Sequence, residues 1–279
     1  MGRIVVTGAS GRLGRAVAER LLDAGEAPIL VTRRPAALAD LAARGAAVRP
    51  GDFDDPAGLA RAFAGGERLL LISTDALDRR VAQHRAAIDA AVAAGVRHLV
   101  YTSLSDPVPG HPVAEVTDAH RHTEAALRAL GPAIRWTILR NATYADALVP
   151  LWRRASAEGR LVTNLGHGTT AWVARADCAA VAAAVLTTDG HDHTVHDITG
   201  PERLGAEDLA RLLGVPVVPV TDEEMTAHLV AQGLAPARAE LVATWHRAIR
   251  EGHFAPCTTT VEDLTGHPAT TVAALLADA

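Results

Sequence analysis

Short apolar runs alternate with longer segments of helical periodicity over the first half of the chain. The runs expected to form strands are Arg3–Thr7, Ile29–Thr32, Ala47–Pro50, Leu69–Ser73, His98–Thr102 and Trp136–Arg140. The segments expected to form helices are Leu13–Ala24, Ala36–Arg44, Pro56–Phe63, Arg79–Ala94 and Thr117–Leu130. Continuous apolar strands between helices indicate a parallel sheet covered on both faces. The pattern therefore predicts an α/β protein with a doubly wound parallel (Rossmann) sheet.

The alternation weakens after Arg140, where most segments have a helical pattern. The expected helices are Leu151–Glu158, Ala176–Leu186, Ala206–Leu213, Asp222–Gln232, Ala237–Glu251 and Ala269–Ala277. His193–Thr199 and Val215–Val220 have the pattern of short strands. We expect residues 1–150 to form the Rossmann domain and residues 151–279 a smaller, mostly helical substrate lobe. Segments near 176–199 are expected to return to the main sheet.

Three glycines follow the first apolar run at regular spacing. Residues 3–17 read RIVVTGASGRLGRAV, so Gly8, Gly11 and Gly14 lie between a strand and a helix. Glycines at these positions allow a tight turn, close approach of backbone amides to a pyrophosphate, and close packing of helix on strand. The helix N-terminus then faces the phosphates. This context predicts an NAD(P)-binding site.

The residues after the second and third strands concern the adenosine end of such a cofactor. An NAD-specific site usually has an acid about 20 residues past the glycines, whereas this chain has Arg33 and Arg34. Guanidinium groups favour a 2′-phosphate, so we expect NADP(H) to be preferred over NAD(H); two solvated surface arginines are the alternative. Asp52 and Phe53 suit an adenine, or else belong to the helix start that follows.

The ends of the fourth to sixth strands should line the nicotinamide crevice. They carry Ser73, Thr74, Thr102, Ser103, Arg140, Asn141 and Tyr144. These side chains can fix the nicotinamide ribose and carboxamide, although capping of the strand ends explains them equally well.

The chain has no lysine, so the tyrosine–lysine pair of most short-chain dehydrogenases is impossible. The corresponding stretch contains His120 and Glu124, which share a helix face at i, i+4. A histidine beside a carboxylate can shuttle a proton; a surface helical turn is the alternative.

Weak acid catalysis restricts the substrate. Reducing a ketone forms an alkoxide whose conjugate acid has a pKa of about 16, by analogy with water. Reducing a quinone forms a phenolate with a pKa of about 10, like tyrosine. Six pKa units correspond to about 8 kcal/mol. A quinone, or another electron-poor conjugated acceptor, therefore needs much less help from a protein acid.

Together these residues give the chain a family resemblance. It resembles the NmrA-like atypical short-chain dehydrogenases, most closely the type-2 NAD(P)H:quinone oxidoreductases. The segments that carry the resemblance are TGASGRLG, RLLLIST, QHRAAIDAAVAAGVRHLVYTSL, DAHRHTEAAL, LRNATYAD, ARADCAAVAAAVL and GHPATTVAALL.

The resemblance implies two lobes with the substrate cleft between them. It implies that the cofactor is contacted by Gly8, Ser10, Gly11, Arg12, Leu13 and Gly14, with Arg33 at the 2′-phosphate. Ser73 and Leu139–Asn141 would lie by the nicotinamide, and Tyr144 would edge the substrate pocket. One departure is Ala125, where the family often has a lysine.

The predicted function is an NAD(P)H-dependent oxidoreductase that transfers hydride to a quinone or a similar conjugated, aromatic metabolite. His120, Asn141 and Tyr144 are its candidates for catalysis. Two alternatives stay open: a redox-sensing NmrA-like regulator that binds NADP(H) without turnover, and a reductase that tailors natural products.

The composition of the chain limits which classes of binding partner and which cellular compartment we expect. A net charge of −5 argues against general nucleic-acid binding, which needs a basic surface. Two cysteines, Cys178 and Cys257, are typical of a reduced, cytoplasmic protein. No apolar run approaches the ~20 residues of a membrane span. The histidines of residues 191–196 alternate across a strand, so no metal site is expected. A homodimer is left open.

Overall fold

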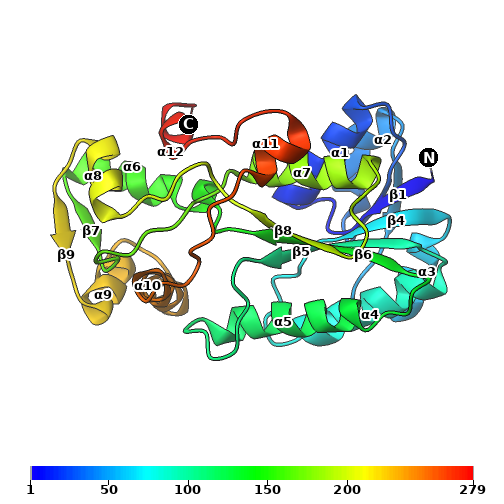
Figure 1. Cartoon of the computed structure of the whole chain (residues 1–279), viewed down its shortest axis with the longest axis horizontal. Coiled ribbons are helices and arrows are strands. Elements are labelled where there is room, and N and C mark those ends of the chain that lie inside the picture. The colour runs from blue at the N-terminus through cyan, green and yellow to red at the C-terminus, as the bar shows by residue number, and fades with distance from the viewer. Residues whose placement is uncertain (1, 279) are drawn as a thin grey trace.

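The computed structural model describes residues 2–278. Its main layer is a seven-stranded parallel sheet (Figure 1). In spatial order the strands are β3 (Ala47–Pro50), β2 (Ile29–Thr32), β1 (Arg3–Val6), β4 (Gly66–Leu71), β5 (His98–Leu104), β6 (Arg135–Asn141) and β8 (Thr194–Ile198). Every neighbouring pair is parallel. The order reverses between β1 and β4, and ligands of such sheets bind at the carboxyl ends beside this reversal.

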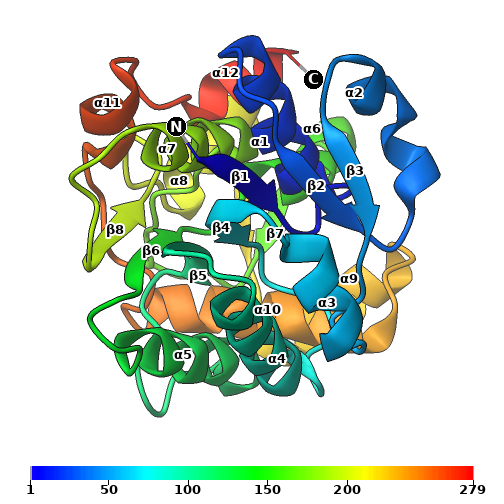
Figure 2. The same ribbon diagram turned by 90° about the vertical axis from the view of Figure 1, so that its right-hand side faces the viewer.

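Helices cover both faces of this sheet (Figure 2). One face packs against α1 (Arg12–Asp23), η1 (Pro35–Leu38), α2 (Ala39–Ala43), α7 (Arg175–Thr187) and α11 (Thr260–Thr265). The other packs against α3 (Pro56–Phe63), α4 (Arg80–Ala93) and α5 (Ala114–Arg128). Successive strand residues enter opposite cores, as Val5 and Val6 do, because strand side chains alternate between faces. The predicted doubly wound class is confirmed.

The C-terminal lobe is mostly helical and lies at the left of Figure 1. It contains η2 (Ala145–Ala147), α6 (Val149–Glu158), α8 (Ala206–Leu213), α9 (Asp222–Ala231), α10 (Pro236–Arg250) and α12 (Val272–Asp278). Its two strands, β7 (Leu161–Thr163) and β9 (Val217–Pro219), pair in parallel. Trp152, Trp172 and Phe254 fill its core. Within residues 2–278, no helix combines the length and apolar character needed to cross a membrane.

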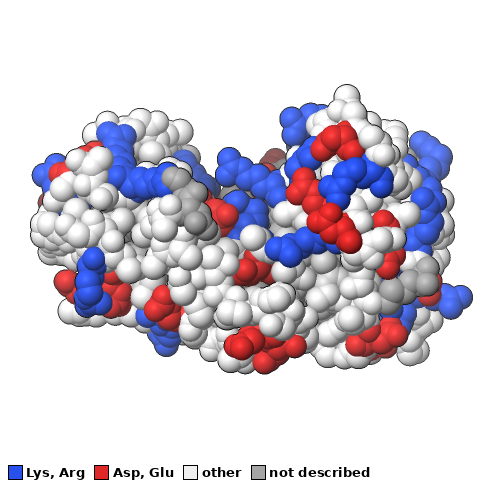
Figure 3. Space-filling model, turned by 90° about the horizontal axis from the view of Figure 1, so that it is seen from above, with Lys and Arg blue, Asp and Glu red and all other residues white. Residues whose placement is uncertain are grey.

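Two elements that follow residue 150 belong to the main sheet layer. β8 pairs with β6 along five residue pairs, and α7 packs against α1. Seen from above, the surface is indented between the C-terminal lobe and the sheet layer, with arginine side chains at the margin (Figure 3). The boundary near residue 150 stays a prediction.

The start of α1 lies so close to β1 that only glycine fits at position 14. A Cβ on Gly14 would lie 2.4 Å from the Gly8 carbonyl oxygen and 2.8 Å from Ala9 Cα. Both neighbours are backbone atoms, so neither can move away cheaply. The helix start and the turn therefore fix each other's position.

Gly14→Ala is expected to lower the free energy of unfolding by about 2 kcal/mol, because overpacking at a rigid contact is destabilising. It should also abolish dinucleotide binding, because it displaces the turn. Urea denaturation and calorimetry measure the two effects. Gly131→Ala is the matched control, since a Cβ there meets nothing within 4 Å. Equal stability of the two variants would contradict this account.

Candidate functional site

The turn after β1 presents unpaired amides at the start of α1. Gly8 has a φ of +59°, and the Gly11 N–H donates to the Gly8 carbonyl at 2.9 Å. Gly11 is the N-cap and supplies no side-chain acceptor, and the first turn of α1 contains no acid. Arg12 is exposed and Leu13 is buried. The first N–H groups of the helix are therefore available to an anion such as a pyrophosphate.

Two hydroxyls join this turn to the end of β2. Ser10 Oγ lies 2.7 Å from Thr32 Oγ1, and the Arg34 N–H donates to Thr32 Oγ1 at 3.1 Å. The side chains of Arg33 and Arg34 are exposed and form no ion pair within residues 2–278. Arg33 lines an open hollow together with Arg49, Asp52 and Arg61 among others. A phosphate at the end of β2 would meet positive charge there.

The structure separates the two explanations offered for the acids after β3. Asp55 caps α3, since its Oδ1 accepts the Gly58 N–H at 3.0 Å, and Pro56 follows. Within residues 2–278 the Asp52 carboxylate accepts a single hydrogen bond, from the Asp54 N–H at 3.1 Å. Phe53 is half-buried against the core beneath α3 and α4. Capping therefore does not require Asp52, and its role at an adenine stays a prediction.

The carboxyl ends of β4 and β6 carry buried polar atoms with no partner. The Ser73 N–H donates to Thr102 Oγ1 at 3.0 Å, whereas Thr74 Oγ1 is buried without a hydrogen bond. Asn141 Nδ2 donates to Tyr144 Oη at 2.8 Å, and Asn141 Oδ1 has no partner in the described chain. Unsatisfied buried groups cost about 1–3 kcal/mol each. The edge therefore fits a bound group with its own donors and acceptors, such as a carboxamide and a ribose.

The side chains of Arg140 and Ser103, which were predicted to contact the cofactor, bind a carboxylate of α5 instead. Arg140 donates to both oxygens of Glu124, at 2.9 and 2.8 Å, and Ser103 Oγ donates to one of them at 2.7 Å. Arg128 lies 3.0 Å from the same carboxylate. Burial raises the pKa of Glu124, but the hydrogen bonds and the two positive charges outweigh it, and the net pKa is lowered. Both side chains thus serve to bind α5. Leu139 is fully buried in β6 between β5 and β8, and its contact with a cofactor stays a prediction.

His120 is placed differently from the prediction. Its Nδ1 lies 2.7 Å from Tyr101 Oη, and its Nε2 lies 3.5 Å from Arg80 Nη1. Glu124 is bound to other groups, so the predicted pairing of His120 with that carboxylate is wrong. Burial and the Arg80 charge hold the pKa of His120 well below its usual value. Its ring is therefore neutral and lies in a buried network; its proposed proton transfer stays a prediction.

Sequence reasoning missed the other members of this network. The Thr74 N–H donates to His84 Nε2 at 3.1 Å, and His84 Nδ1 lies 2.9 Å from Thr123 Oγ1. Arg80 Nε donates to the Thr74 carbonyl at 2.7 Å. The network holds the chain after β4 in place. The spacing of residues does not predict this network, because its members belong to separate helices and strands that come together only in the folded protein.

Tyr144 lies at the junction of the two lobes. Its backbone pairs with Val173 in an isolated parallel β-bridge. The Arg175 guanidinium carbon lies 5.0 Å from the centroid of its ring. Burial is the main cause that raises the pKa of Tyr144. The phenol therefore stays protonated at neutral pH, and the Asn141 amide donates to its oxygen.

One cluster of metal-binding residue types lies outside the histidine stretch considered in the sequence. Asp106, His111 and His253 bring one side-chain ligand atom each within 4.8 Å of the others. However, His111 Nδ1 accepts the Val113 N–H at 3.1 Å, so the neutral ring carries its proton on Nε2. A ligand nitrogen must be unprotonated. The cluster is therefore better suited to tethering loops than to binding a metal.

Comparison with known proteins agrees with this geometry. Residues 8–189 match a family model described as NAD(P)H-binding. Quinone oxidoreductase 2 of Escherichia coli is 35% identical, over 97% of this chain and 96% of that protein. The chain belongs to this NAD(P)H-binding, NmrA-like family. The resemblance inferred from the sequence is confirmed, and the chain is an NAD(P)H-dependent oxidoreductase.

Two further members show how broad the family is. A Streptomyces griseus (4-alkanoyl-5-oxo-2,5-dihydrofuran-3-yl)methyl phosphate reductase is 36% identical, over 95% of this chain and 94% of that protein. The structure of a Citrobacter triphenylmethane reductase with NADP(H) has a TM-score of 0.91 at 31% identity, and 99% of each chain is covered. Both of these relatives are named as reductases, and their names differ in the acceptor.

Glu124→Gln is expected to lower the free energy of unfolding by about 2 kcal/mol at neutral pH, because it leaves two arginines without their carboxylate. The folded pKa of Glu124 lies below its ordinary value of 4.5. Its stabilisation is therefore present above pH 4.5 and is lost as the pH falls through the lower, folded pKa. Urea unfolding from pH 3 to pH 7 measures it.

The control is Asp118→Asn, which breaks an exposed pair with Arg121 and should change stability little. A difference between wild type and Glu124→Gln that is independent of pH would contradict the assignment of this carboxylate.

Proposed function

We propose that the protein is an NADPH-dependent reductase of quinones or of similarly conjugated aromatic acceptors. The observation that carries the proposal is that this chain cannot form the tyrosine–lysine pair that serves most short-chain dehydrogenases as proton donor. The chain has no lysine, the His120 ring is neutral and bonded, and burial raises the pKa of Tyr144. Acceptors whose reduced form is a weak base need little acid catalysis.

Within this proposal the residues of the turn and the strand ends divide the cofactor between them. The amides at the start of α1 would hold the pyrophosphate, and the hollow at Arg33 would hold the adenosine end. Asn141 Oδ1 would accept a hydrogen bond at the nicotinamide end, and the Thr74 hydroxyl would accept or donate one there. The bound nicotinamide supplies the hydride. Tyr144 would edge the space beside it and exclude water.

NADPH is proposed over NADH because positive charge collects where a 2′-phosphate would lie. Arg33 and Arg61 line the same hollow and form no ion pair within the described chain. Arg49 lines it too, but donates to the carbonyls of Ala62 and Ala64. Asp52 and Asp55 line the hollow as well, but neither forms an ion pair with these arginines within the described chain, and three guanidinium groups face two carboxylates. A guanidinium stabilises a phosphate by charge-assisted hydrogen bonds.

A conjugated lactone is the second candidate acceptor. The Streptomyces griseus relative, at 36% identity, is a reductase of a furanone phosphate. Reduction of an enone or lactone places hydride on carbon and leaves an enolate, which also needs less acid than an alkoxide. The two classes differ in aromaticity, which makes them separable by a panel of acceptors.

We also infer a small-molecule partner and a cytoplasmic location. Cys178 and Cys257 are free thiols, and burial raises the pKa of the Cys178 thiol well above its usual value. Reduced cysteines are typical of cytoplasmic proteins.

Turnover is tested by stopped flow with NADPH and a panel containing naphthoquinone, a conjugated lactone and an ordinary ketone. We expect NADPH oxidation well above the rate without enzyme for the quinone, and none for the ketone. Cofactor binding without turnover of any acceptor would instead support the redox-sensing regulator. Reaction with the lactone alone would move the assignment to the second candidate.

Arg33→Ala should weaken NADPH binding about tenfold, or about 1.4 kcal/mol, because one charge-assisted contact to the 2′-phosphate is lost. NADH binding should change less than twofold. Calorimetry with each cofactor measures both constants. Arg20→Ala, which removes an exposed arginine from the far end of α1, is the control. Equal losses for the two cofactors would overturn the NADPH assignment.

A further inference from the structure

Four rings lie together between the sheet layer and the C-terminal lobe and form what we call the aromatic wall: His111, His253, Phe254 and Trp245. The Trp245 and Phe254 rings stack with centroids 4.8 Å apart and planes 4° apart. His111 contacts both Phe254, at 4.7 Å, and His253, at 4.2 Å. The wall joins the loop after β5 to α10 and the segment that follows it.

Both ends of the aromatic wall are bonded to the carboxyl edge of the sheet. Trp245 Nε1 donates to Thr143 Oγ1 at 2.8 Å, and His253 Nδ1 lies 2.9 Å from Asp106 Oδ2. Thr143 and Asp106 each lie two residues beyond the end of their strand, β6 and β5 respectively. Asn141, with its unpartnered oxygen, is also at the end of β6. The wall therefore borders the edge where hydride transfer is proposed.

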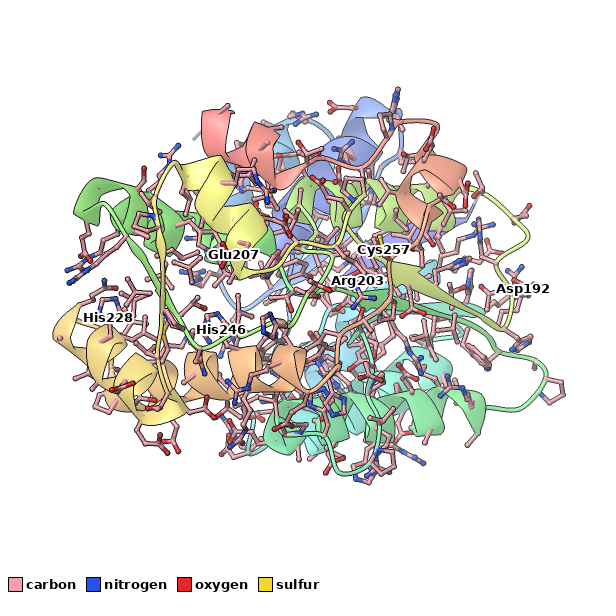
Figure 4. The ribbon with its side chains drawn as sticks, turned by 60° about the vertical axis from the view of Figure 1, so that its left-hand side comes forward. Asp192, Arg203, Glu207, His228, His246 and Cys257 are labelled. Carbon is pink, nitrogen blue, oxygen red and sulfur yellow. The ribbon has the colours of Figure 1, made fainter. Side chains whose placement is uncertain are left out.

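Two rings of the wall are partly accessible, Trp245 and His253, and Trp245 is the larger and the more apolar of the two. Phe254 is 1% exposed and His111 is 2% exposed, whereas Trp245 is only partly buried. One face of the indole is covered by Phe254, so its accessible surface lies away from that ring. The next residue of α10, His246, points toward β7 (Figure 4), where its Nδ1 lies 2.9 Å from Asn164 Oδ1. Trp245 and His246 thus point in different directions from α10, the first toward Thr143 and the second toward Asn164.

The backbone beside the wall is held in an unusual conformation. Asp106 has a φ of +54° and Phe254 a φ of +57°, and neither is glycine. Such conformations cost free energy and persist only where the surrounding structure imposes them, often at ligand sites. Here the bond between His253 and Asp106 connects the two strained segments directly. The position of the stack is therefore imposed by the fold.

We propose that the accessible part of the Trp245 indole, on the side away from Phe254, is the surface on which an aromatic acceptor stacks, and that it selects fused-ring acceptors over non-aromatic ones. This inference rests on the proposed function. The electron-rich indole suits an electron-poor quinone ring, and the stacking needs no bonding change. A non-aromatic enone presents no such ring. Trp245 would accordingly set the KM for aromatic substrates and leave the chemical step to the cofactor.

The test compares Trp245→Leu, which retains apolar bulk, with Trp245→Phe, which retains a ring. Calorimetry measures naphthoquinone binding to protein saturated with NADP⁺. We expect about tenfold weaker binding for Trp245→Leu and a loss below threefold for Trp245→Phe, as is typical of stacking. In steady state the KM for naphthoquinone should rise in parallel while kcat changes less than threefold, and the KM for cyclohexenone should stay within twofold.

Trp136→Leu is the matched control, because that indole lies at the start of β6 against Arg128, away from the carboxyl edge. It should leave naphthoquinone binding unchanged. Thr143→Ala is a second test that keeps the indole and removes only its tether; it should weaken binding about threefold.

Wild-type binding by Trp245→Leu, or equal losses in the Leu and Phe variants, would overturn the proposal. If wild type binds naphthoquinone but never oxidises NADPH, the proposed function fails, while the calorimetric comparison still decides the role of Trp245.

Discussion

The contact between Gly14 and the Gly8 carbonyl is the constraint on which the rest of the site depends. Because α1 begins against the backbone of the turn, its first amides are fixed relative to the end of β1. The hydroxyl pair of Ser10 and Thr32 then sets the end of β2 relative to the same turn. The turn proposed to hold the pyrophosphate and the end of β2 proposed to hold the adenosine are therefore fixed relative to each other by this short hydroxyl pair and by the Ala9 N–H, which donates to the Val31 carbonyl at 3.2 Å.

A second constraint acts at the other end of the crevice. Glu124 enters the sheet edge from α5 and binds groups on β5 and β6, as well as Arg128 of its own helix. A buried carboxylate is tolerable only when its oxygens are fully bonded. This one is, and its pKa is lowered accordingly. The desolvation cost of the carboxylate is thus offset by its hydrogen bonds, which fix α5 against the ends of β5 and β6, where Ser103 and Asn141 lie.

The sequence predicted most of the fold because strands and helices have strong periodic signals. The helices over 56–63 and 206–213 begin and end where the pattern placed them. β7 and α11, of three and six residues, were missed. β9 is as short as β7, but it was predicted because it lies within the longer apolar run Val215–Val220. The predicted strand at 69–73 lies at Gly66–Leu71, because its start pairs with β1 despite a glycine and two charged residues.

The site was predictable only where spacing is local. The glycine turn is one contiguous motif, whereas Arg140 and Glu124 meet across 16 residues and His120 meets Tyr101 across 19. Polar residues at the strand ends are thus of two kinds that the sequence does not distinguish: some face the proposed cofactor site, and others bind α5. Strand alternation decides which: Leu139 and Asn141 share the α1 face, and Arg140 faces α5. A polar residue at a strand end therefore predicts a ligand contact only when its face is known, and pairing across the sheet fixes that face.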